Sequence, residues 1–184
     1  MKRLLDVMLA FAALLVLAPV WLLAALAIAL ESGGPVLFQQ TRLGLQGREF
    51  NMLKFRSMHR NAAAIGPYFT AANDTRITRV GRFIRRTSID ELPQLINVLR
   101  GDMSLVGPRP DVPAQRSLYS QVDWVQRCSV RPGITGLAQA LLRSEATEAQ
   151  RLAFDLRYTR EASVWFDLKI LGLTVARLSG KGSN

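Results

Sequence analysis

Cysteine and histidine are almost absent from this 184-residue sequence, which contains one of each. A single Cys128 cannot form an internal disulfide framework or a cysteine-rich zinc site. With His59 as the only histidine, multi-histidine metal ligation within one chain is excluded, and a Ser-His-Asp site would have to use it. If the protein is an enzyme, carboxylates, arginines and lysines must therefore carry its chemistry.

The sequence also has no internal repeats, no Walker A loop and no GxGxxG fingerprint. Its length suits one domain with a real core. Lys and Arg number 24 against 14 Asp and Glu, which gives a formal net charge of +10. Such a surface is expected to bind phosphates, whether on a nucleic acid, a nucleotide or an anionic membrane.

A long uncharged apolar run extends from Val7 to Leu30, about the length that crosses a bilayer as a helix. A secretory signal peptide fits poorly, because the run is long and no small-x-small cleavage site precedes Glu31. Pro19 lies near the middle of the run, where it removes a backbone hydrogen bond and kinks or breaks a helix.

The charges that flank this run bear on its topology. Lys2 and Arg3 precede it, and Arg42, Arg48 and Lys54 follow it. The positive-inside tendency places both flanks on the cytoplasmic side. A helix that enters the membrane, bends at Pro19 and returns satisfies both flanks, whereas a straight span satisfies one. Proline also occurs in ordinary spanning helices, so the straight span stays open beside the favoured re-entrant helix.

The next segments predict a small β-hairpin. Two strands are expected, at 36–42 and 49–57, around a turn at 44–47. The polar stretch 61–73 is expected to be a loop. Arginines at near-helical spacing between 76 and 86 predict a basic helix, either a solvated face or a strip against lipid headgroups.

Two further helices are expected near the C-terminus. One spans Glu145 to Arg160 with Ser144 as its cap, and the other carries an apolar stripe from Val164 to Leu178. The sequence therefore predicts a mostly helical α+β protein.

The stretch that organises the chain runs from Arg85 to Leu95 and contains the adjacent carboxylates Asp90 and Glu91. Ser88 and Glu91 have the spacing of a capping box at a helix start. Alternatively Asp90 is the cap, and Pro93 falls harmlessly in the first turn. Both interpretations keep Asp90 ionised at the helix mouth, and a purely structural cap beside a few arginines explains the pattern as well.

Arg109 lies between Pro108 and Pro110, which restrict the backbone and present its guanidinium at little ordering cost. A planar fork of donors held in this way suits a phosphate, although a rigid loop with a solvent-facing arginine fits equally. Further along, Arg131 opens the segment 131–136, where a Pro-Gly pair predicts a tight type II turn.

Together these segments resemble the monotopic phosphoglycosyl transferases, the bacterial sugar transferase family. The resemblance covers nearly the whole chain in order. It rests on the segments Lys54-Phe55-Arg56-Ser57-Met58, Thr87-Ser88-Ile89-Asp90-Glu91-Leu92-Pro93-Gln94-Leu95, Asp102-Met103-Ser104-Leu105-Val106-Gly107-Pro108-Arg109-Pro110, Arg131-Pro132-Gly133-Ile134-Thr135-Gly136 and Asp167-Leu168-Lys169-Ile170-Leu171.

The resemblance implies transfer of a phosphosugar from a nucleotide diphosphate sugar, usually a UDP-sugar, to polyprenyl phosphate, with Mg²⁺ as cofactor. It implies that Asp90 is the nucleophile, lies near the metal and forms a covalent phosphosugar intermediate, with Glu91 as partner carboxylate. Six residues are assigned to substrate binding, five in the matched segments and Arg85 just before one of them: Lys54, Arg85, Pro108, Arg109, Pro110 and Arg131.

The resemblance also implies a location. Residues 1–32 would form a re-entrant membrane helix, and residues 33–184 a membrane-associated catalytic domain with interfacial amphipathic helices on the cytoplasmic face of the bacterial inner membrane. The family's helix break is often Ser-Pro, and here it is Ala18-Pro19. The chain is similar to the minimal catalytic form without preceding spans, and a homodimer is compatible with the resemblance.

A different hypothesis is a membrane-anchored basic module that binds anionic lipid or nucleic acid without catalysis. Aromatic residues are not interleaved with the basic clusters as base stacking requires, so no nucleic-acid partner is expected. A third hypothesis, a degenerate transferase that serves as a scaffold, is disfavoured by the intact Asp90-Glu91 pair and Arg109.

Overall fold

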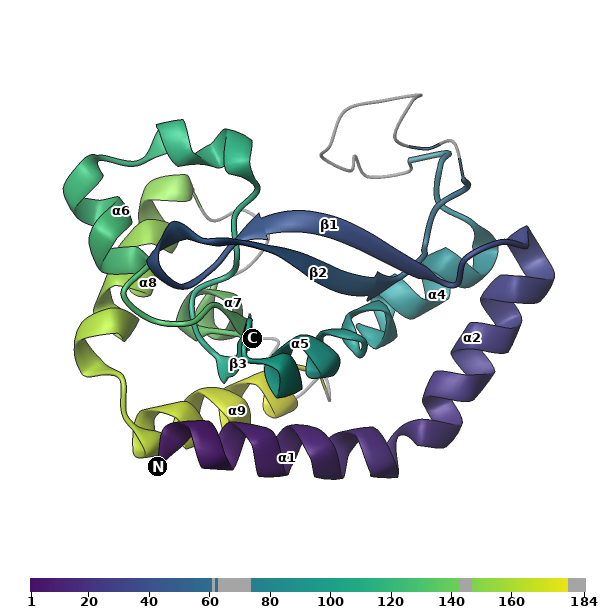
Figure 1. Cartoon of the computed structure of the whole chain (residues 1–184), viewed down its shortest axis with the longest axis horizontal. Coiled ribbons are helices and arrows are strands. Elements are labelled where there is room, and N and C mark those ends of the chain that lie inside the picture. The colour runs from purple at the N-terminus through teal and green to yellow at the C-terminus, as the bar shows by residue number, and fades with distance from the viewer. Residues whose placement is uncertain (61, 63–73, 143–146, 179–184) are drawn as a thin grey trace.

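The computed structural model describes residues 1–60, 62, 74–142 and 147–178 (Figure 1). Within these residues the protein is mostly helical, with two small two-stranded sheets. The prediction of a mostly helical protein with a β-hairpin is confirmed at this level. The predicted loop at 61–73, Ala62 apart, and the predicted helix start at 144–145 lie outside the described residues.

The apolar run forms two helices, α1 (Lys2–Val16) and α2 (Ala18–Ser32), which meet at Leu17 with a bend of 62°. Figure 1 shows α1 along the lower edge of the molecule and α2 turning away from its end. Pro19 is the second residue of α2, where a backbone N–H has no partner within the helix, so the proline costs no hydrogen bond. The predicted break is confirmed, two residues before the proline.

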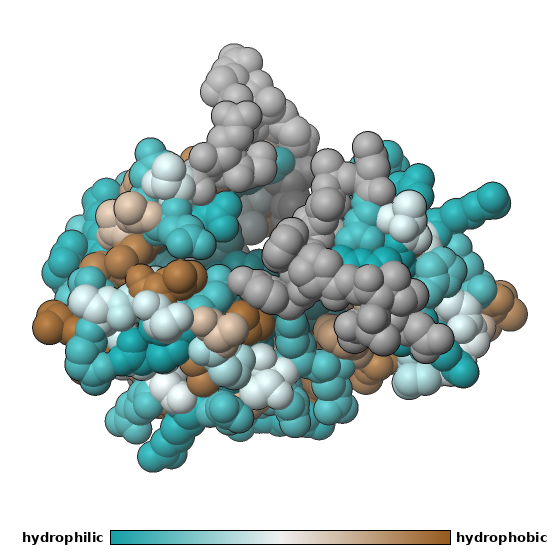
Figure 2. Space-filling view, turned by 90° about the horizontal axis from the view of Figure 1, so that it is seen from above, coloured by the Kyte–Doolittle hydropathy of each residue, from teal (hydrophilic) through white to brown (hydrophobic). Residues whose placement is uncertain are grey.

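No single helix in the described ranges is long and apolar enough to cross a membrane, whereas the bent pair reaches that length and composition. Large apolar side chains on both helices face outward. They include Leu4, Met8, Phe11, Leu15, Leu22, Leu23, Leu26 and Leu30. The face seen from above in Figure 2 is mainly hydrophilic where its residues are described, with scattered apolar side chains.

The hairpin consists of β1 (Leu37–Leu43) and β2 (Glu49–Phe55), paired antiparallel and joined through the short 3-10 turn η1 (Leu45–Gly47). It matches the predicted strands to within two residues. The fully buried Asn97 of α5 (Gln94–Arg100) fixes β2 to that helix. Its side chain accepts the N–H of Leu53 at 2.9 Å and donates to the carbonyl of Asn51 at 2.9 Å.

The segment after Arg131 is a strand, so the predicted type II turn is wrong. β4 (Gly133–Thr135) pairs in parallel with β3 (Ser104–Val106). A type II turn needs a positive φ at its glycine, and Gly133 has none. Glycine is required there by close approach, because a Cβ would lie 2.1 Å from the backbone nitrogen of Gly107. This pairing places the start of the segment that leads from β3 to Arg109 beside β4.

The predicted basic helix is confirmed as α4 (Arg79–Arg86), which is capped by the Thr78 hydroxyl. The Glu31 carboxylate at the end of α2 accepts the first two N–H groups of α4, at 2.8 and 3.0 Å. Negative charge is favourable at a helix N-terminus, so this contact joins α4 to the apolar helix pair. Phe83 and three arginines of α4 are exposed.

The C-terminal half adds elements that cover the second sheet. They are η3 (Pro113–Leu118), α6 (Gln121–Arg127), α7 (Leu137–Leu141), α8 (Glu148–Glu161) and α9 (Val164–Leu178). Thr147 caps α8 through a capping box with Gln150, whereas the predicted cap, Ser144, is outside the described residues. The predicted last helix is confirmed.

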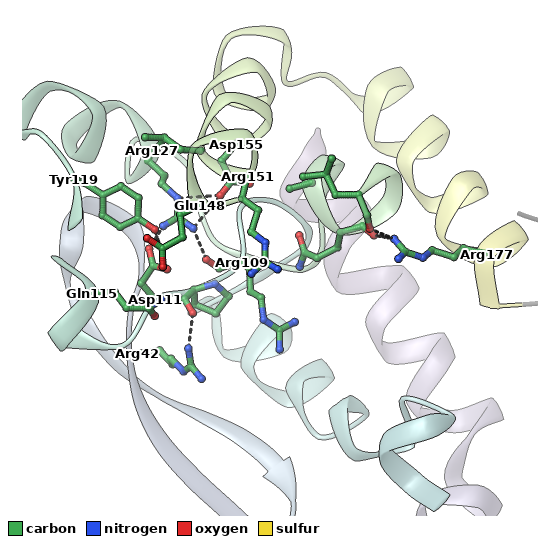
Figure 3. A pocket seen from close by; sticks show the side chains of 15 residues that line it. Arg42, Arg109, Asp111, Gln115, Tyr119, Arg127, Glu148, Arg151, Asp155 and Arg177 are labelled. Atoms are coloured by element: carbon green, nitrogen blue, oxygen red, sulfur yellow. Dashed lines mark hydrogen bonds and ion pairs between the residues drawn. The ribbon is translucent and has the colours of Figure 1, made fainter. Parts of the chain in front are cut away.

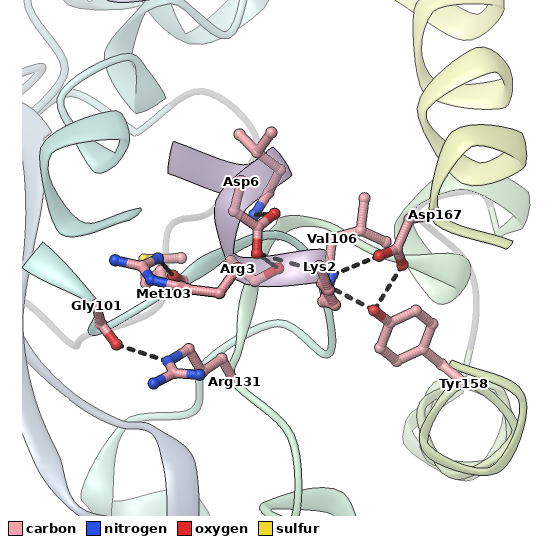
Figure 4. Close-up of polar contacts among 11 residues, drawn as sticks. Lys2, Arg3, Asp6, Gly101, Met103, Val106, Arg131, Tyr158 and Asp167 are labelled. Carbon is pink, nitrogen blue, oxygen red and sulfur yellow. Dashed lines mark hydrogen bonds and ion pairs between the residues drawn. The ribbon is translucent and has the colours of Figure 1, made fainter. Parts of the chain in front are cut away.

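Buried polar contacts hold the start of α1 against the second sheet and α9 (Figure 4). Asp6, only 5% exposed, accepts hydrogen bonds from the Ser104 hydroxyl at 2.9 Å and the Leu105 N–H at 3.1 Å. Lys2 forms an ion pair with Asp167, which also accepts the Tyr158 hydroxyl at 2.7 Å. Lys2 was predicted only as a charge that sets the topology, and the structure shows that it also joins α1 to α9.

Candidate active site

Asp90 and Glu91 lie in a short 3-10 turn, η2 (Ile89–Glu91), between α4 and α5. The predicted capping box is wrong, because Ser88 has a φ of 57° and its side chain caps no helix. Asp90 does not cap α5 either, since that helix begins directly after Pro93. Pro93 has a helical φ of −61° and no N–H to donate, which suits the residue preceding a helix. The two carboxylates are therefore carried on the turn before the helix.

Glu91 is bound by two of the predicted basic residues. Its Oε1 accepts a hydrogen bond from Lys54 Nζ at 2.9 Å and one from Arg109 Nη2 at 3.1 Å. Burial opposes ionisation of Glu91, but the charges of Arg109 and Lys54 outweigh it and lower the pKa to about 2. Glu91 is therefore a fixed anion that positions two cations, and it is a weak base.

Asp90 has the opposite environment. It is 8% exposed, and none of the described residues donates a hydrogen bond to its carboxylate. Burial raises the pKa of Asp90, while the charges of Lys54, Arg85 and Arg109 act against this rise. The carboxylate thus keeps its lone pairs available for a ligand or a reaction, and cations lie close by.

These cations come from three separate parts of the fold. Lys54 lies near the end of β2, Arg85 in the last turn of α4, and Arg109 in the segment after β3. All three were predicted site residues, and the structure brings them together around Asp90.

The backbone around Arg109 is fixed by three hydrogen bonds to consecutive carbonyls. Pro108 accepts the N–H of Gly133 at 2.9 Å, and Pro110 accepts Arg42 Nη1 at 2.9 Å. Between them, the carbonyl of Arg109 accepts Arg127 Nη2 at 2.7 Å. The predicted rigid presentation of Arg109 is confirmed, and half of its side chain remains exposed.

Arg127 is the centre of a buried ionic network that the sequence did not indicate. It is 6% exposed and binds Asp111 and Asp155, while its guanidinium lies 5.2 Å from the centre of the Tyr119 ring. Two carboxylates share this one guanidinium, and burial raises the pKa of both, that of Asp155 to about 6. The residues come from separate helices and a loop, so no local spacing in the sequence marks them.

Arg131 is placed elsewhere. Its Nε donates to the carbonyl of Gly101 at 2.9 Å, close to Arg3 and the start of α1 (Figure 4). Gly101 ends α5 in the left-handed region, with a φ of 98°. The structure therefore does not bring Arg131 together with the other predicted site residues, and its side chain supports the end of α5.

Two cavities flank the site. The basic cavity, of about 460 Å³, is lined by side chains from β1, the segment after β3 and the helical elements η3, α6, α7, α8 and α9 (Figure 3). Its charged lining residues are Arg42, Arg109, Arg127, Arg151, Arg177, Asp111, Glu148 and Asp155. Five arginines stand against three acids among the described lining residues, so the cavity has an excess of positive charge and is suited to an anion.

Arg42 illustrates the excess of positive charge in the basic cavity. Burial and the nearby charge of Arg109 lower its pKa to about 10. Two guanidinium groups that repel one another across a cavity are stabilised when an anion binds between them.

The apolar cavity, of about 550 Å³, lies between the α1–α2 bend and η2. Its apolar lining includes Ala13, Leu17, Val20, Ile89, Leu92, Leu95 and Ile134. Both chain neighbours of Asp90 line it, as does Arg109. Three described residues, Arg109, Gln139 and Arg177, border both cavities, so the two cavities adjoin beside the arginine that binds Glu91.

Comparison with known proteins bears on this arrangement. The family model described as bacterial sugar transferase matches residues 1–181. The chain belongs to this family.

Relatives of this sugar transferase include two UDP-glucose:undecaprenyl-phosphate glucose-1-phosphate transferases. That of Caulobacter vibrioides is 51% identical, over 96% of this chain and 69% of the relative. That of Escherichia coli is 47% identical, over 95% of this chain but 39% of the relative. An exopolysaccharide production protein PSS of Rhizobium leguminosarum bv. phaseoli is 45% identical, over 99% of this chain and 98% of the relative.

The chain thus spans about two fifths of the Escherichia coli relative and nearly all of the Rhizobium relative.

A magnesium ion is compatible with the acidic pair. In the described part of the chain, no group of three or more Cys, His, Asp or Glu side chains is arranged to hold a metal. Mg²⁺ commonly takes one or two protein carboxylates and completes its shell with water and substrate phosphates. Asp90, whose carboxylate receives no hydrogen bond from the described residues, fits that pattern.

The Asp155 environment predicts a pH-dependent stability. The folded carboxyl has a pKa of about 6, above its ordinary value, so its contribution is present below pH of about 4 and lost as pH rises through about 6. Between pH 4 and pH 7, the free energy of unfolding of the wild type should therefore fall by about 1–3 kcal/mol more than that of Asp155→Asn. Denaturant titrations in detergent would measure this. Asp123→Asn, near the start of α6, is the control, and parallel wild-type and Asp155→Asn profiles would contradict the assignment.

Proposed function

We propose that this sugar transferase moves a phosphosugar from a UDP-sugar to undecaprenyl phosphate and releases UMP. The observation that carries the proposal is the Asp90 carboxylate, which receives no hydrogen bond in the described part of the chain and is set among Lys54, Arg85 and Arg109. Its chain neighbours line an apolar cavity, and Arg109 borders a basic one. UDP-glucose is the first donor to test, because two relatives are named for it.

The two cavities suit two chemically different substrates. The basic cavity matches a nucleotide diphosphate, since guanidinium groups bind phosphate oxygens through paired hydrogen bonds. The apolar cavity matches the chain of a prenyl lipid, and it is bordered by the outward-facing helix pair. The phosphate of the lipid would then lie near Glu91 and Arg109, at the end of the cavity that holds the acidic pair.

The first step forms a bond between an Asp90 oxygen and the phosphorus that carries the sugar. The bond from that phosphorus to the bridging oxygen of the diphosphate breaks, and UMP leaves with the electron pair. Since no described residue donates a hydrogen bond to the Asp90 carboxylate, no such bond has to break before it attacks. Arg109 and Lys54 stabilise the charge that develops on the phosphoryl oxygens.

The second step regenerates Asp90. A phosphate oxygen of the lipid bonds to the same phosphorus, and the bond to the Asp90 oxygen breaks. The lipid diphosphate sugar then leaves with its chain in the apolar cavity. Because the covalent intermediate separates the two steps, donor and acceptor do not have to be bound together.

A magnesium ion, held by Asp90 and by donor phosphate oxygens, would offset the repulsion between an anionic nucleophile and an anionic diphosphate. Glu91 is not the base in this scheme. With its pKa held at about 2 by Arg109 and Lys54, it keeps those two cations in place.

The α1–α2 pair is proposed to enter the inner membrane and return to the cytoplasmic face, with the catalytic domain on that face. Three observations support this topology. The pair bends by 62°, its large side chains are exposed, and Glu31 joins its end to the basic helix α4. Membrane lipids are thus the surroundings of α1 and α2.

Replacing the nucleophile tests the proposed chemistry. With UDP-glucose, undecaprenyl phosphate and Mg²⁺, Asp90→Asn should lower the rate of UMP release by roughly 10⁴-fold, because an amide cannot form the intermediate. Asp123→Asn should keep the wild-type rate. Turnover by Asp90→Asn at the wild-type rate would show that Asp90 is not the nucleophile. Failure of the wild type to release UMP from any nucleotide sugar would favour a membrane-anchored binding module.

Cysteine accessibility tests the topology. In a Cys128→Ser background, a cysteine added before Met1 and another at Arg48, which is exposed in the hairpin, should both react with an impermeant reagent only from the cytoplasmic side. The extent of labelling is compared between inverted vesicles, which expose the cytoplasmic side, and right-side-out vesicles. Labelling of the two positions from opposite sides would mean that the helix pair crosses the membrane.

A further inference from the structure

Gln139 occupies the boundary between the basic and apolar cavities. It lies on α7 and borders both, together with Arg109 and Arg177. Arg177 of α9 donates hydrogen bonds to the carbonyls of Gln139 and Leu142, so the backbone of α7 is fixed at this point (Figure 3).

The amide of Gln139 receives and donates no hydrogen bond among the described residues. Both Nε2 and Oε1 are shielded from solvent, and no described residue bonds to either atom. By contrast, the buried amide of Asn97 bonds Leu53, Asn51 and Asp102. A buried amide that bonds nothing lowers stability, so its presence at a cavity boundary calls for an explanation.

We propose that Gln139 hydrogen-bonds a hydroxyl group of the transferred sugar, which makes it a specificity-determining residue; this rests on the proposed function. Rotation about the side-chain torsions turns the amide into the cavity when the sugar is present. An amide both donates and accepts, as a hydroxyl does. The two arginines beside it only donate, which suits the adjoining phosphate.

The position of Gln139 fits both half-reactions. The phosphosugar is present when UMP leaves and again when the lipid phosphate attacks. A residue that borders the basic and the apolar cavity can contact the sugar in both steps. A site built to bond a hydroxyl also rejects an analogue that lacks it, because its polar group is then left unpaired.

Deoxy-sugar donors test this assignment. The specificity constant for UMP release is measured for UDP-glucose and its 2-, 3-, 4- and 6-deoxy analogues, with wild type, Gln139→Ala and Gln139→Met. Wild type should use one analogue about 10- to 100-fold less well than UDP-glucose. In both variants the specificity constant for UDP-glucose should exceed that for this analogue by no more than about threefold. The preference falls because the variants lose activity with UDP-glucose itself.

Gln126→Ala is the matched control. The Gln126 amide bonds Leu156 and Thr159 and borders neither cavity, so this variant should keep the wild-type ratio. Both Gln139 variants should melt at or above the wild-type temperature, since they remove no hydrogen bond.

Three results would overturn the proposal. These are an unchanged ratio in the Gln139 variants, equal use of every analogue by wild type, and a lowered melting temperature in both variants, which would make the amide structural. Absence of UMP release by wild type from every donor would instead refute the proposed function.

Discussion

The contact on which the site depends is the pairing of Glu91 with Lys54 and Arg109. It joins the hairpin, the turn before α5 and the segment after β3, which are distant in sequence. Charge-assisted hydrogen bonds to a partly buried carboxylate are stronger and more directional than neutral ones, so the pairing fixes where both cations lie. Those same cations surround Asp90, and Arg109 also borders the two cavities. One ion pair thus positions the charge that a phosphoryl transfer requires.

Adjacent carboxylates acquire opposite properties from their surroundings. Asp90 is buried and Glu91 is half-buried, yet cations lower the pKa of Glu91 and burial raises that of Asp90. The difference lies in direct hydrogen bonds, which Glu91 receives from Lys54 and Arg109 and which no described residue donates to Asp90. In the proposed reaction Glu91 organises the cations and Asp90 reacts. Behind them, Arg127 holds the carbonyl of Arg109 and so keeps its guanidinium directed at Glu91.

Sequence patterns predicted the elements that have a local signature. The apolar run with Pro19, the two strands on either side of a turn and the arginine spacing of α4 all depend on near neighbours, and the structure agrees. The acidic pair and the held Arg109 were found through motifs. Contacts between distant segments have no such signature. The parallel pairing of Gly133 with Ser104, the Arg127 network and the unbonded amide of Gln139 each depend on tertiary packing. The capping box at Ser88 failed because Pro93 delays the helix and the turn before it takes a left-handed residue.

The central claim is that the phosphosugar passes through a covalent bond to Asp90. The most direct measurement is mass spectrometry of the purified protein after incubation with UDP-glucose and Mg²⁺ in the absence of lipid. The account predicts a hexose phosphate on the peptide that contains Asp90, and its disappearance when undecaprenyl phosphate is added. Wild-type protein that produces lipid-linked sugar at full rate, yet never carries this modification before the lipid is added, would contradict it.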